Sequence, residues 1–256
     1  MNLLEIKNLN ISFDTPDGIV RAVSGVDFNL EKNDSLAIVG ESGSGKTQLV
    51  FSILGLLAKN ATSSGSIKYE SKEILNASEK ELNSIRSKKI SIIFQDPMTS
   101  LNPYMRISDQ LNEVLIHHKG ISNNEAMKES IKMLDAVKIP EVKNRINMFP
   151  HEFSGGMRQR VMIAMSLLCR PDILIADEPT TSLDVTIQAA YLRLLKRIQS
   201  ESDIGIIFIT HDFGIVAKMC DRVAVMYLGH IIELAETDQL FVNALKTERS
   251  SKRNLL

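Results

Sequence analysis

Cysteine, net charge and long apolar runs are all scarce in this sequence. Its 256 residues hold only two cysteines, Cys169 and Cys220, which stand far apart in apolar surroundings and lack the spacing of a metal site. We expect both to be buried thiols of a reducing compartment. The formal net charge is −1, so no overall positive field favours a nucleic-acid partner.

Segments that would enter a membrane or a secretory pathway are also missing. The first ten residues carry neither a basic region nor a long apolar run, so we expect no signal peptide. The most apolar helical stretch, residues 161–169, is too short to cross a bilayer. Any membrane association is therefore expected to be peripheral. The length and the 44% hydrophobic content suit one large α/β domain or two small ones.

A glycine-rich stretch stands between an apolar strand signal at residues 35–39 and a helix signal at residues 47–57. It reads G-x-x-x-x-G-K-T, the pattern of a phosphate-binding loop in its required strand–loop–helix context. The stretch consists of Gly40, Glu41, Ser42, Gly43, Ser44, Gly45, Lys46 and Thr47.

The chemistry of this stretch suits a nucleotide phosphate. Glycines allow the backbone to wrap closely around an anion, and the wrapped N–H groups and the helix start then hold phosphate oxygens. Lys46 is expected to neutralise charge on the β- and γ-phosphates, and the Thr47 hydroxyl to bind Mg²⁺. A chance glycine-rich turn is the alternative, and further motifs downstream weigh against it.

The N-terminal part predicts a hairpin. Strands are expected at residues 3–13 and 19–31, with a turn at 15–18, and the alternation over residues 26–30 is typical of a strand with one wet face. Phe13 is either a purine-stacking residue or an ordinary core aromatic, and from the residue alone the core reading is the better one.

Between the loop helix and the next buried strand, the pattern is weaker. We expect a turn-rich break at residues 61–65, a short strand at 66–70, a polar helix at 79–88 and a buried strand at 90–94. Pro97 stops the chain from continuing as a strand.

Polar side chains follow three apolar strands. Gln95 follows the first, Asp177 and Glu178 end the second, and His211 follows the third, at residues 204–210. Open α/β sheets bind ligands at the carboxyl ends of their strands. Gln95 alone is equally consistent with a residue leaving the sheet, and a lone histidine is usually structural. Because polar residues follow three strands, a ligand-binding role for His211 becomes more plausible than a purely structural one.

The two acids have distinct expected roles. Asp177 fits an acid that holds Mg²⁺ together with Thr47 and water, and Glu178 fits a general base for water attacking the γ-phosphate. Adjacent acids at a buried strand end are costly unless they are used.

Residues 100–150 change character, because no strand pattern occurs among them. They predict a helical subdomain inserted into an α/β frame, with helices at residues 107–118, 124–137 and 141–148. His117 and His118 have no supporting ligands and are expected at the surface.

A second candidate anion site begins the next helix. Ser154 is a good N-cap for a helix to about Leu168, and Gly155 and Gly156 offer bare N–H groups at its positive end. A plain capped helix is an equally good reading of these residues alone.

The C-terminal part predicts a helix capped by residues 181–184, strands at 221–227 and 230–234, and a last helix near 238–245. The core face of the first of these helices is expected to comprise Ile187, Tyr191, Leu194 and Ile198.

Taken together, these motifs resemble the ATP-binding subunits of ATP-binding-cassette (ABC) transporters in type, order and spacing over nearly the whole chain. The resemblance implies an α/β fold: a P-loop NTPase (RecA-like) core, an N-terminal antiparallel β subdomain and an inserted helical subdomain. The core with its β subdomain would span residues 1–95 and 165–245, the helical signature subdomain about 100–164, and a polar tail 246–256.

Within this family the chain looks most like the oligopeptide and dipeptide importer ATPases. The phrases at residues 94–103 and 153–160 and the insertion at residues 15–18 carry this likeness. Departures from the family pattern are Gln48, with one hydroxyl fewer near the α-phosphate, Asn33 in place of a turn glycine and Ser182 in place of an alanine. The cysteine cluster of some relatives is missing, so no iron–sulfur cluster is expected.

By the resemblance, the cofactors are ATP and Mg²⁺. Phe13 becomes the adenine-stacking residue, Gln48 lies beside the phosphates, and Gln95 and His211 contact the γ-phosphate, water or Mg²⁺. Ser154, Gly155 and Gly156 close over the γ-phosphate of ATP bound to a partner ATPase, and Asp184 matches the D-loop residue of the family. Glu178 polarises the attacking water.

The implied partners are two polytopic permease subunits, a second ATP-binding subunit that is a paralogue, and indirectly an extracytoplasmic substrate-binding protein. The chain would lie peripherally on the cytoplasmic face of the inner (plasma) membrane. Cargo other than oligopeptides or dipeptides, such as nickel, glutathione or an antimicrobial peptide, stays open. A soluble ABC-type ATPase of repair or translation fits less well, because no coiled-coil insertion or second cassette is present.

Overall fold

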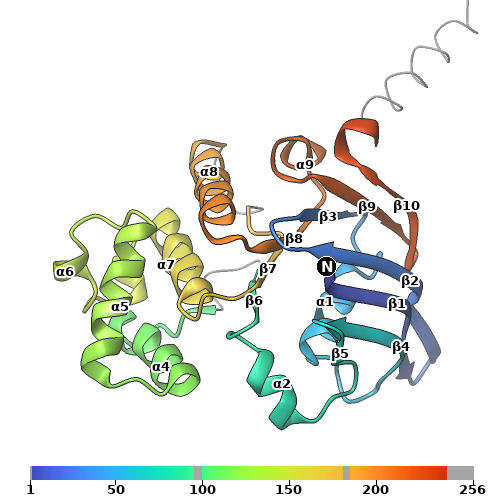
Figure 1. The fold of residues 1–256 in the computed structure, drawn as a ribbon, viewed down its shortest axis with the longest axis horizontal. Coiled ribbons are helices and arrows are strands. Elements are labelled where there is room, and N and C mark those ends of the chain that lie inside the picture. The colour runs from blue at the N-terminus through green and yellow to red at the C-terminus, as the bar shows by residue number, and fades with distance from the viewer. Residues whose placement is uncertain (1, 95–99, 181–184, 241–256) are drawn as a thin grey trace, which may run out of the picture. The chain divides into compact units, whose positions relative to one another are not determined.

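The computed structural model describes residues 2–94, 100–180 and 185–240, apart from the side chains of residues 185–187. It divides into two compact units, Met1–Ser78 with Gly205–Leu256 and Glu79–Ile204 (Figure 1). The fold contains the antiparallel β subdomain, the α/β portion and the helical portion that the sequence predicts.

The first unit contains a four-stranded antiparallel sheet in the order β2-β1-β4-β5. Its strands are β1 (Asn2–Thr15), β2 (Gly18–Glu31), β4 (Ala61–Tyr69) and β5 (Lys72–Glu73). The predicted hairpin of β1 and β2 is confirmed, and the Thr15 hydroxyl donates a 2.6 Å hydrogen bond to the Gly18 carbonyl across its turn. Residues 26–30 alternate between buried and more exposed positions as expected.

The predicted break at residues 61–65 is wrong, because this stretch is the first half of β4. Ala61 pairs with Phe13 and Thr62 with Ser12, so pairing with β1 overrides the turn-forming composition. Gly65 has a φ of +106° and lies against the Asn8 carbonyl, where a Cβ would collide. The glycine therefore marks a close backbone approach at a register shift within the sheet.

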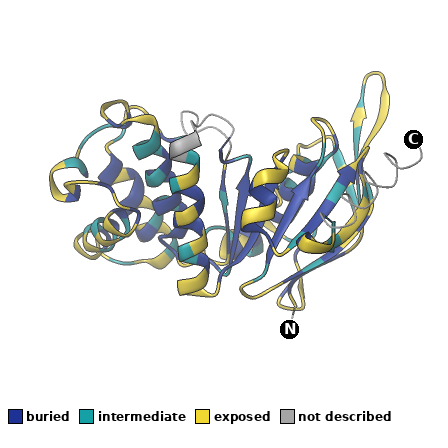
Figure 2. Cartoon of the chain, turned by 90° about the horizontal axis from the view of Figure 1, so that it is seen from above, coloured by how far each residue is buried: buried dark blue, intermediate teal, exposed yellow. Residues whose placement is uncertain are grey.

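The same unit holds β3 (Ser35–Val39), β8 (Gly205–Thr210), β9 (Arg222–Tyr227) and β10 (His230–Glu236), in the order β10-β9-β3-β8. β3 runs parallel to β8 and β9, whereas β10 is antiparallel to β9. Every residue of β3 and β8 is buried, as expected of strands in a parallel sheet covered on both faces (Figure 2). The helices are α1 (Lys46–Leu54) and α9 (Phe213–Met219).

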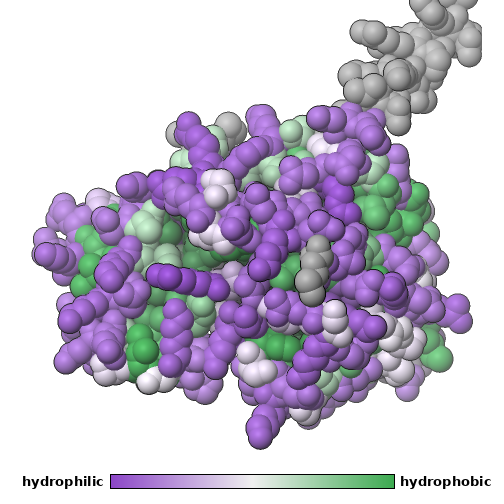
Figure 3. Space-filling view, viewed as in Figure 1, coloured by the Kyte–Doolittle hydropathy of each residue, from purple (hydrophilic) through white to green (hydrophobic). Residues whose placement is uncertain are grey.

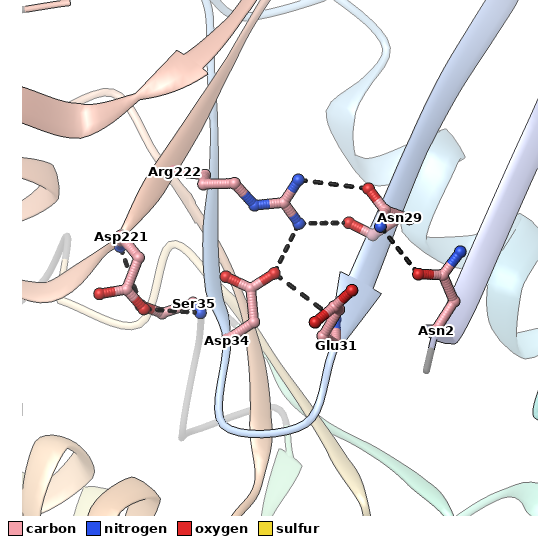
Figure 4. Close-up of polar contacts among 7 residues, drawn as sticks. All are labelled: Asn2, Asn29, Glu31, Asp34, Ser35, Asp221 and Arg222. Carbon is pink, nitrogen blue, oxygen red and sulfur yellow. Dashed lines mark hydrogen bonds and ion pairs between the residues drawn. The ribbon is translucent and has the colours of Figure 1, made fainter. Parts of the chain in front are cut away.

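A polar network fixes the turn between β2 and β3. Arg222 donates to the Asn29 carbonyl at 2.6 Å, to the Asn29 side-chain oxygen at 3.2 Å and to the Asp34 carboxylate at 2.5 Å (Figure 4). Beside it, Asp221 accepts hydrogen bonds from the backbone N–H and the hydroxyl of Ser35. The network thereby joins the start of β9 to the end of β2 and the start of β3.

The second unit contains the parallel pair β6 (Ile90–Ile93) and β7 (Ile173–Asp177). Its helical elements are α2 (Glu79–Ile85), α4 (Ile107–Lys119), α5 (Asn123–Ala136), α6 (Val142–Arg145), the 3₁₀ turn Pro150–Glu152, α7 (Gly155–Leu167) and α8 (Val185–Ser202). The described part of residues 100–150 has no strand, which confirms the helical insertion. The exact boundaries, a helical subdomain at about 100–164 between core segments at 1–95 and 165–245, remain a prediction.

Several element ends differ from the expectation. The helix predicted at 79–88 ends at Ile85, and Ser87 takes a left-handed φ of 63° before β6 begins. The helix predicted at 141–148 is reduced to Val142–Arg145. Glu141, with a left-handed φ of 50°, lies before its first residue, and residues 146–148 form turns and a bend. Residues 237–240 are helical, whereas the rest of the predicted last helix, like the cap at 181–184, lies outside the described residues.

The cysteines and the His117–His118 pair lie much as the sequence predicts. Both cysteines are free and buried, as predicted, and burial raises the pKa of the Cys169 thiol. His117 is exposed and His118 half-buried, and in the described ranges no three His, Cys, Asp or Glu side chains gather as a metal site. No described helix has the length and apolarity needed to cross a bilayer. Hydrophilic side chains dominate the face shown in Figure 3.

We expect Arg222→Met to lower the free energy of unfolding by about 2 kcal/mol, since it leaves the half-buried Asp34 carboxylate without its guanidinium partner. Urea unfolding followed by circular dichroism measures this change. Arg21→Met, at an exposed position of β2, is the matched control and should stay within about 0.5 kcal/mol. Equal unfolding midpoints for the two variants would show that the network contributes little.

Candidate functional site

The glycine-rich loop leaves β3 after Val39 and ends where α1 begins at Lys46. Gly43 and Gly45 have φ values of +80° and +102°, in the left-handed region that glycine adopts without a Cβ penalty. Two left-handed residues within three positions reverse the chain sharply, and the strand thus leads directly into the helix start.

The loop also packs against two strands of the same unit. A Cβ on Gly40 would collide with the Met226 carbonyl of β9, and one on Gly45 with the Ala22 carbonyl of β2. The Gly229 N–H donates a 3.1 Å hydrogen bond to the Ser44 carbonyl. The motif glycines are therefore required by backbone contact as well as by the turn, a second constraint that the pattern itself does not reveal.

Lys46 is buried within its own loop, with 6% of its surface exposed. Its ammonium donates 2.8 Å hydrogen bonds to the carbonyls of Gly40 and Glu41 and a 3.4 Å bond to the Ser44 hydroxyl. The first turn of α1 carries no acidic residue, so the positive end of the helix is not offset locally. The arrangement concentrates positive potential where the sequence predicts phosphate binding.

Three other predicted residues lie in the same unit. Thr47 is exposed in the first turn of α1, with Gln48 half-buried after it. Phe13 is half-buried in β1, opposite Val20 and Ala61, so burial alone favours neither the core reading nor the stacking reading. Both roles stay predictions for this side chain.

His211 lies at the same sheet edge as the start of the loop. Val39 and Thr210 are in register across β3 and β8, so the next residues, Gly40 and His211, leave neighbouring strand ends. His211 is exposed.

Asp212, for which the sequence predicts no role, caps α9 by accepting hydrogen bonds from the N–H groups of Gly214 and Ile215 at 2.7 and 3.3 Å. An acid directly before a helical pattern was the available signal for this cap.

In the second unit, Asp177 ends β7 and Glu178 follows it. Asp177 is buried with 8% exposure, whereas Glu178 is half-exposed and has a left-handed φ of 44°. This conformation is unfavourable for a residue with a Cβ, and the residue before a proline normally prefers extended backbone. Strain of this kind gathers at functional sites. The sequence placed the two acids correctly at a strand end but gave no sign of the strain.

Gln95 lies outside the described residues, as does Asp184. Ile93 pairs with Ala176 across β6 and β7, so the described end of β6 lies beside the end of β7 at Asp177. Each unit thus presents polar groups at the carboxyl ends of its parallel strands, the position at which α/β sheets bind ligands.

Ser154 caps α7, as predicted. Its hydroxyl accepts from the Met157 N–H at 3.3 Å, and both Ser154 and Gly155 are exposed. A Cβ on Gly155 would meet no atom within 4 Å, and the first turn of the helix has no acidic residue. An anion can therefore approach this helix start, although the cap alone would also be satisfied without one.

Comparison with known proteins gives the class. A family model described as ABC transporter matches residues 23–181, more than half of the chain. The chain therefore belongs to the ABC transporter family, and its class is that of the ATP-binding-cassette ATPases. The dimeric ATP-binding cassette MJ0796, solved in a post-hydrolysis state with ADP and Pi, has a TM-score of 0.80 at 26% identity, covering 91% of this chain and 98% of that chain.

Curated relatives narrow this class. The chain is 57% identical to the oligopeptide transport ATP-binding protein OppD of Salmonella typhimurium, over 93% of this chain and 71% of that protein. It is 51% identical to the dipeptide transport ATP-binding protein DppD of Bacillus subtilis, over 93% of this chain and 72% of that protein. The chain is a close homologue of these two transport ATPases.

We expect Gly45→Ala to lower the unfolding midpoint by the equivalent of about 2 kcal/mol, because the new Cβ is both strained and in collision with β2. Gly155→Ala is the matched control, at a position with open space, and should stay within about 0.5 kcal/mol. Differential scanning calorimetry compares the two. A Gly45→Ala chain that melts with the wild type would mean that the loop is not held against β2.

Proposed function

We propose that this chain is the ATP-hydrolysing subunit of an importer for oligopeptides or dipeptides. The observation that carries the proposal is the loop at residues 40–47, whose buried Lys46 ammonium, left-handed glycines and unshielded helix start form a phosphate-binding geometry. The peptide cargo rests on the likeness to OppD and DppD.

The loop residues Gly40, Glu41, Ser42, Gly43, Ser44, Gly45, Lys46, Thr47 and Gln48 hold the phosphates of ATP. Phe13 stacks on the adenine ring. Lys46 exchanges its loop carbonyls for β- and γ-phosphate oxygens, since an ammonium has three donors and charged acceptors bind it more strongly than neutral ones.

Mg²⁺ is the implied metal, and each unit by itself offers an oxygen donor of the kind that this ion binds. Thr47 offers an exposed hydroxyl at the helix start, and Asp177 a carboxylate at the end of β7. Oxygen ligands of this kind, completed by phosphate oxygens and water, are what Mg²⁺ prefers. Gln95 is the third candidate ligand. The ion would supply charge neutralisation on the transferred phosphoryl group.

Hydrolysis needs a group that orients and activates water. Glu178 takes this role in the proposal, and its strained backbone is consistent with a side chain held in a required direction. His211 and Gln95 contact the γ-phosphate or the attacking water. Each of these residues follows the carboxyl end of a parallel strand.

The second helix start supports a composite site. Ser154, Gly155 and Gly156 form the N-terminus of α7, where the first two are exposed and the first turn has no acid, and this helix start would close over ATP held by a partner ATPase. The dimeric state of the MJ0796 cassette is consistent with such an arrangement. The partner is a second ATP-binding subunit, a paralogue in this proposal, and two polytopic permease subunits dock near residues 96–106.

The chain would thus work peripherally on the cytoplasmic face of the membrane, with an extracytoplasmic substrate-binding protein acting indirectly and no nucleic-acid partner. Cargo is recognised by the other subunits, so import of nickel, glutathione or an antimicrobial peptide by the same machinery is the second candidate. We also expect this chain to bind no iron–sulfur cluster.

We expect Glu178→Gln to bind ATP with near wild-type affinity but to lose turnover by a factor of about 10² or more, because the amide cannot accept a proton from water. Calorimetry and phosphate release measure the two properties. Glu233→Gln, an exposed residue of β10, removes the same charge and should leave turnover unchanged. Full activity in the Glu178 variant would remove this residue from the catalytic role.

The transport proposal is tested by purifying the tagged chain from detergent-solubilised membranes and identifying bound proteins by mass spectrometry. We expect two polytopic subunits and a second ATPase, and a co-purified or co-encoded binding protein would then identify the cargo. Recovery only with ribosomal or DNA-repair proteins would leave the ATPase chemistry intact and overturn the transport function.

A further inference from the structure

A cavity of about 270 Å³ lies in the second unit, at the C-terminal end of α5 and beside α7 and α8. Four of its seven lining residues are cationic, and none of the seven is acidic. The lining comprises Val137, Lys138, Arg160, Ala190, Arg193, Leu194 and Arg197. Like charges around one cavity repel each other, so their gathering there favours an anion.

Backbone carbonyls orient these cations without neutralising them. Arg160 donates a 2.7 Å hydrogen bond to the Lys138 carbonyl, and Arg197 one of 2.7 Å to the Ala136 carbonyl. Arg193 donates to the Ala189 carbonyl in its own helix at 3.2 Å. A guanidinium has five N–H donors in a planar fork that suits phosphate oxygens, so each arginine retains donors beyond these bonds.

Among the described residues, Arg197 is the cavity cation for which an ion pair is seen. Glu201 lies 3.9 Å from Arg197 Nε, but the two side chains are 65% and 40% exposed, so solvent screens this pair. Arg197 Nε is itself buried and has no hydrogen-bond partner in the described part of the chain. The Glu201 carboxylate, at 3.9 Å, is too far away to accept a hydrogen bond from this donor, so an oxygen of a bound anion could satisfy it.

Lys138 gives independent support. It follows α5 with a left-handed φ of 63°, in a helix ending formed by the Lys138 N–H bond to the Asp135 carbonyl and the Ile139 N–H bond to the Leu134 carbonyl. Glycine normally occupies this place because it has no Cβ. A lysine here carries backbone strain and at the same time adds a cation to the cavity wall.

A simpler explanation is that cations merely satisfy the last carbonyls of α5, which is favourable at a helix C-terminus. It accounts for Arg160 and Arg197, which bond to those carbonyls. It does not account for Arg193, which bonds within α8, or for the strained Lys138. The four cations around one cavity therefore exceed what capping requires.

We propose that this cavity binds a soluble anion carrying two or three linked phosphoryl groups. Its volume of about 270 Å³ lies just below the roughly 300–1,000 Å³ of pockets for drug-sized ligands and suits a short polyphosphate. Three guanidinium groups and one ammonium can pair with the several charges of such an anion. The nucleotide loop at residues 40–47 belongs to the other unit and is a separate feature.

Calorimetry with inorganic tripolyphosphate tests the proposal. All chains compared carry Lys46→Ala, which removes the ammonium of the loop at residues 40–47, so that this loop contributes little heat. We expect one remaining binding event, weakened about tenfold by either Lys138→Gly or Arg193→Gln and further by both together, and weaker again at higher salt.

The variants separate ligand binding from folding. Lys138→Gly relieves the left-handed strain, so its melting temperature should not fall, and weaker binding in this variant cannot come from unfolding. Lys128→Gln removes a positive charge from the exposed face of α5 and should bind as the wild type does. No binding event in the Lys46→Ala background, or one that both cavity variants leave unchanged, would overturn the proposal.

Discussion

Close packing of the loop at residues 40–47 against two strands is the constraint on which much of the first unit depends. The carbonyls of Ala22 and Met226 leave no room for a Cβ on Gly45 or Gly40, so β2, β9 and the loop must be placed together. The Arg222 network then fixes the turn that leads from β2 into β3, the strand from which the loop emerges. Phosphate-binding geometry is thus a product of strand packing and not of the loop sequence alone.

Most of the architecture could be predicted from the sequence because its signals are local. Fully apolar runs gave β3 and β8, and helical spacing gave α4 and α5. The failure at β4 has a different origin: Ser, Thr and Gly at residues 61–65 favour a turn locally, and only pairing with β1 makes them a strand. A short stretch of sequence does not reveal which distant strand it will pair with.

The candidate site shows the same division. Residue types at strand ends indicated Asp177, Glu178 and His211, because polar groups after apolar runs are visible in the sequence. The left-handed backbone of Glu178 could not be foreseen, since nothing in its side chain prefers that conformation and the following proline opposes it. The cationic cavity could not be predicted from the sequence either, because Lys138 and Arg193 are far apart in the chain and come together only in the fold.

The left-handed backbone at Glu178 has an evolutionary consequence. Stability does not select for glutamate at this position, because smaller or more permissive residues such as glycine or asparagine adopt a φ of 44° with less strain. The role proposed for this side chain in hydrolysis would account for the acid, and a single substitution would then leave a well-folded subunit without turnover. Such a subunit would still occupy its place in an assembly, and one defective copy would therefore interfere dominantly with the intact partners around it.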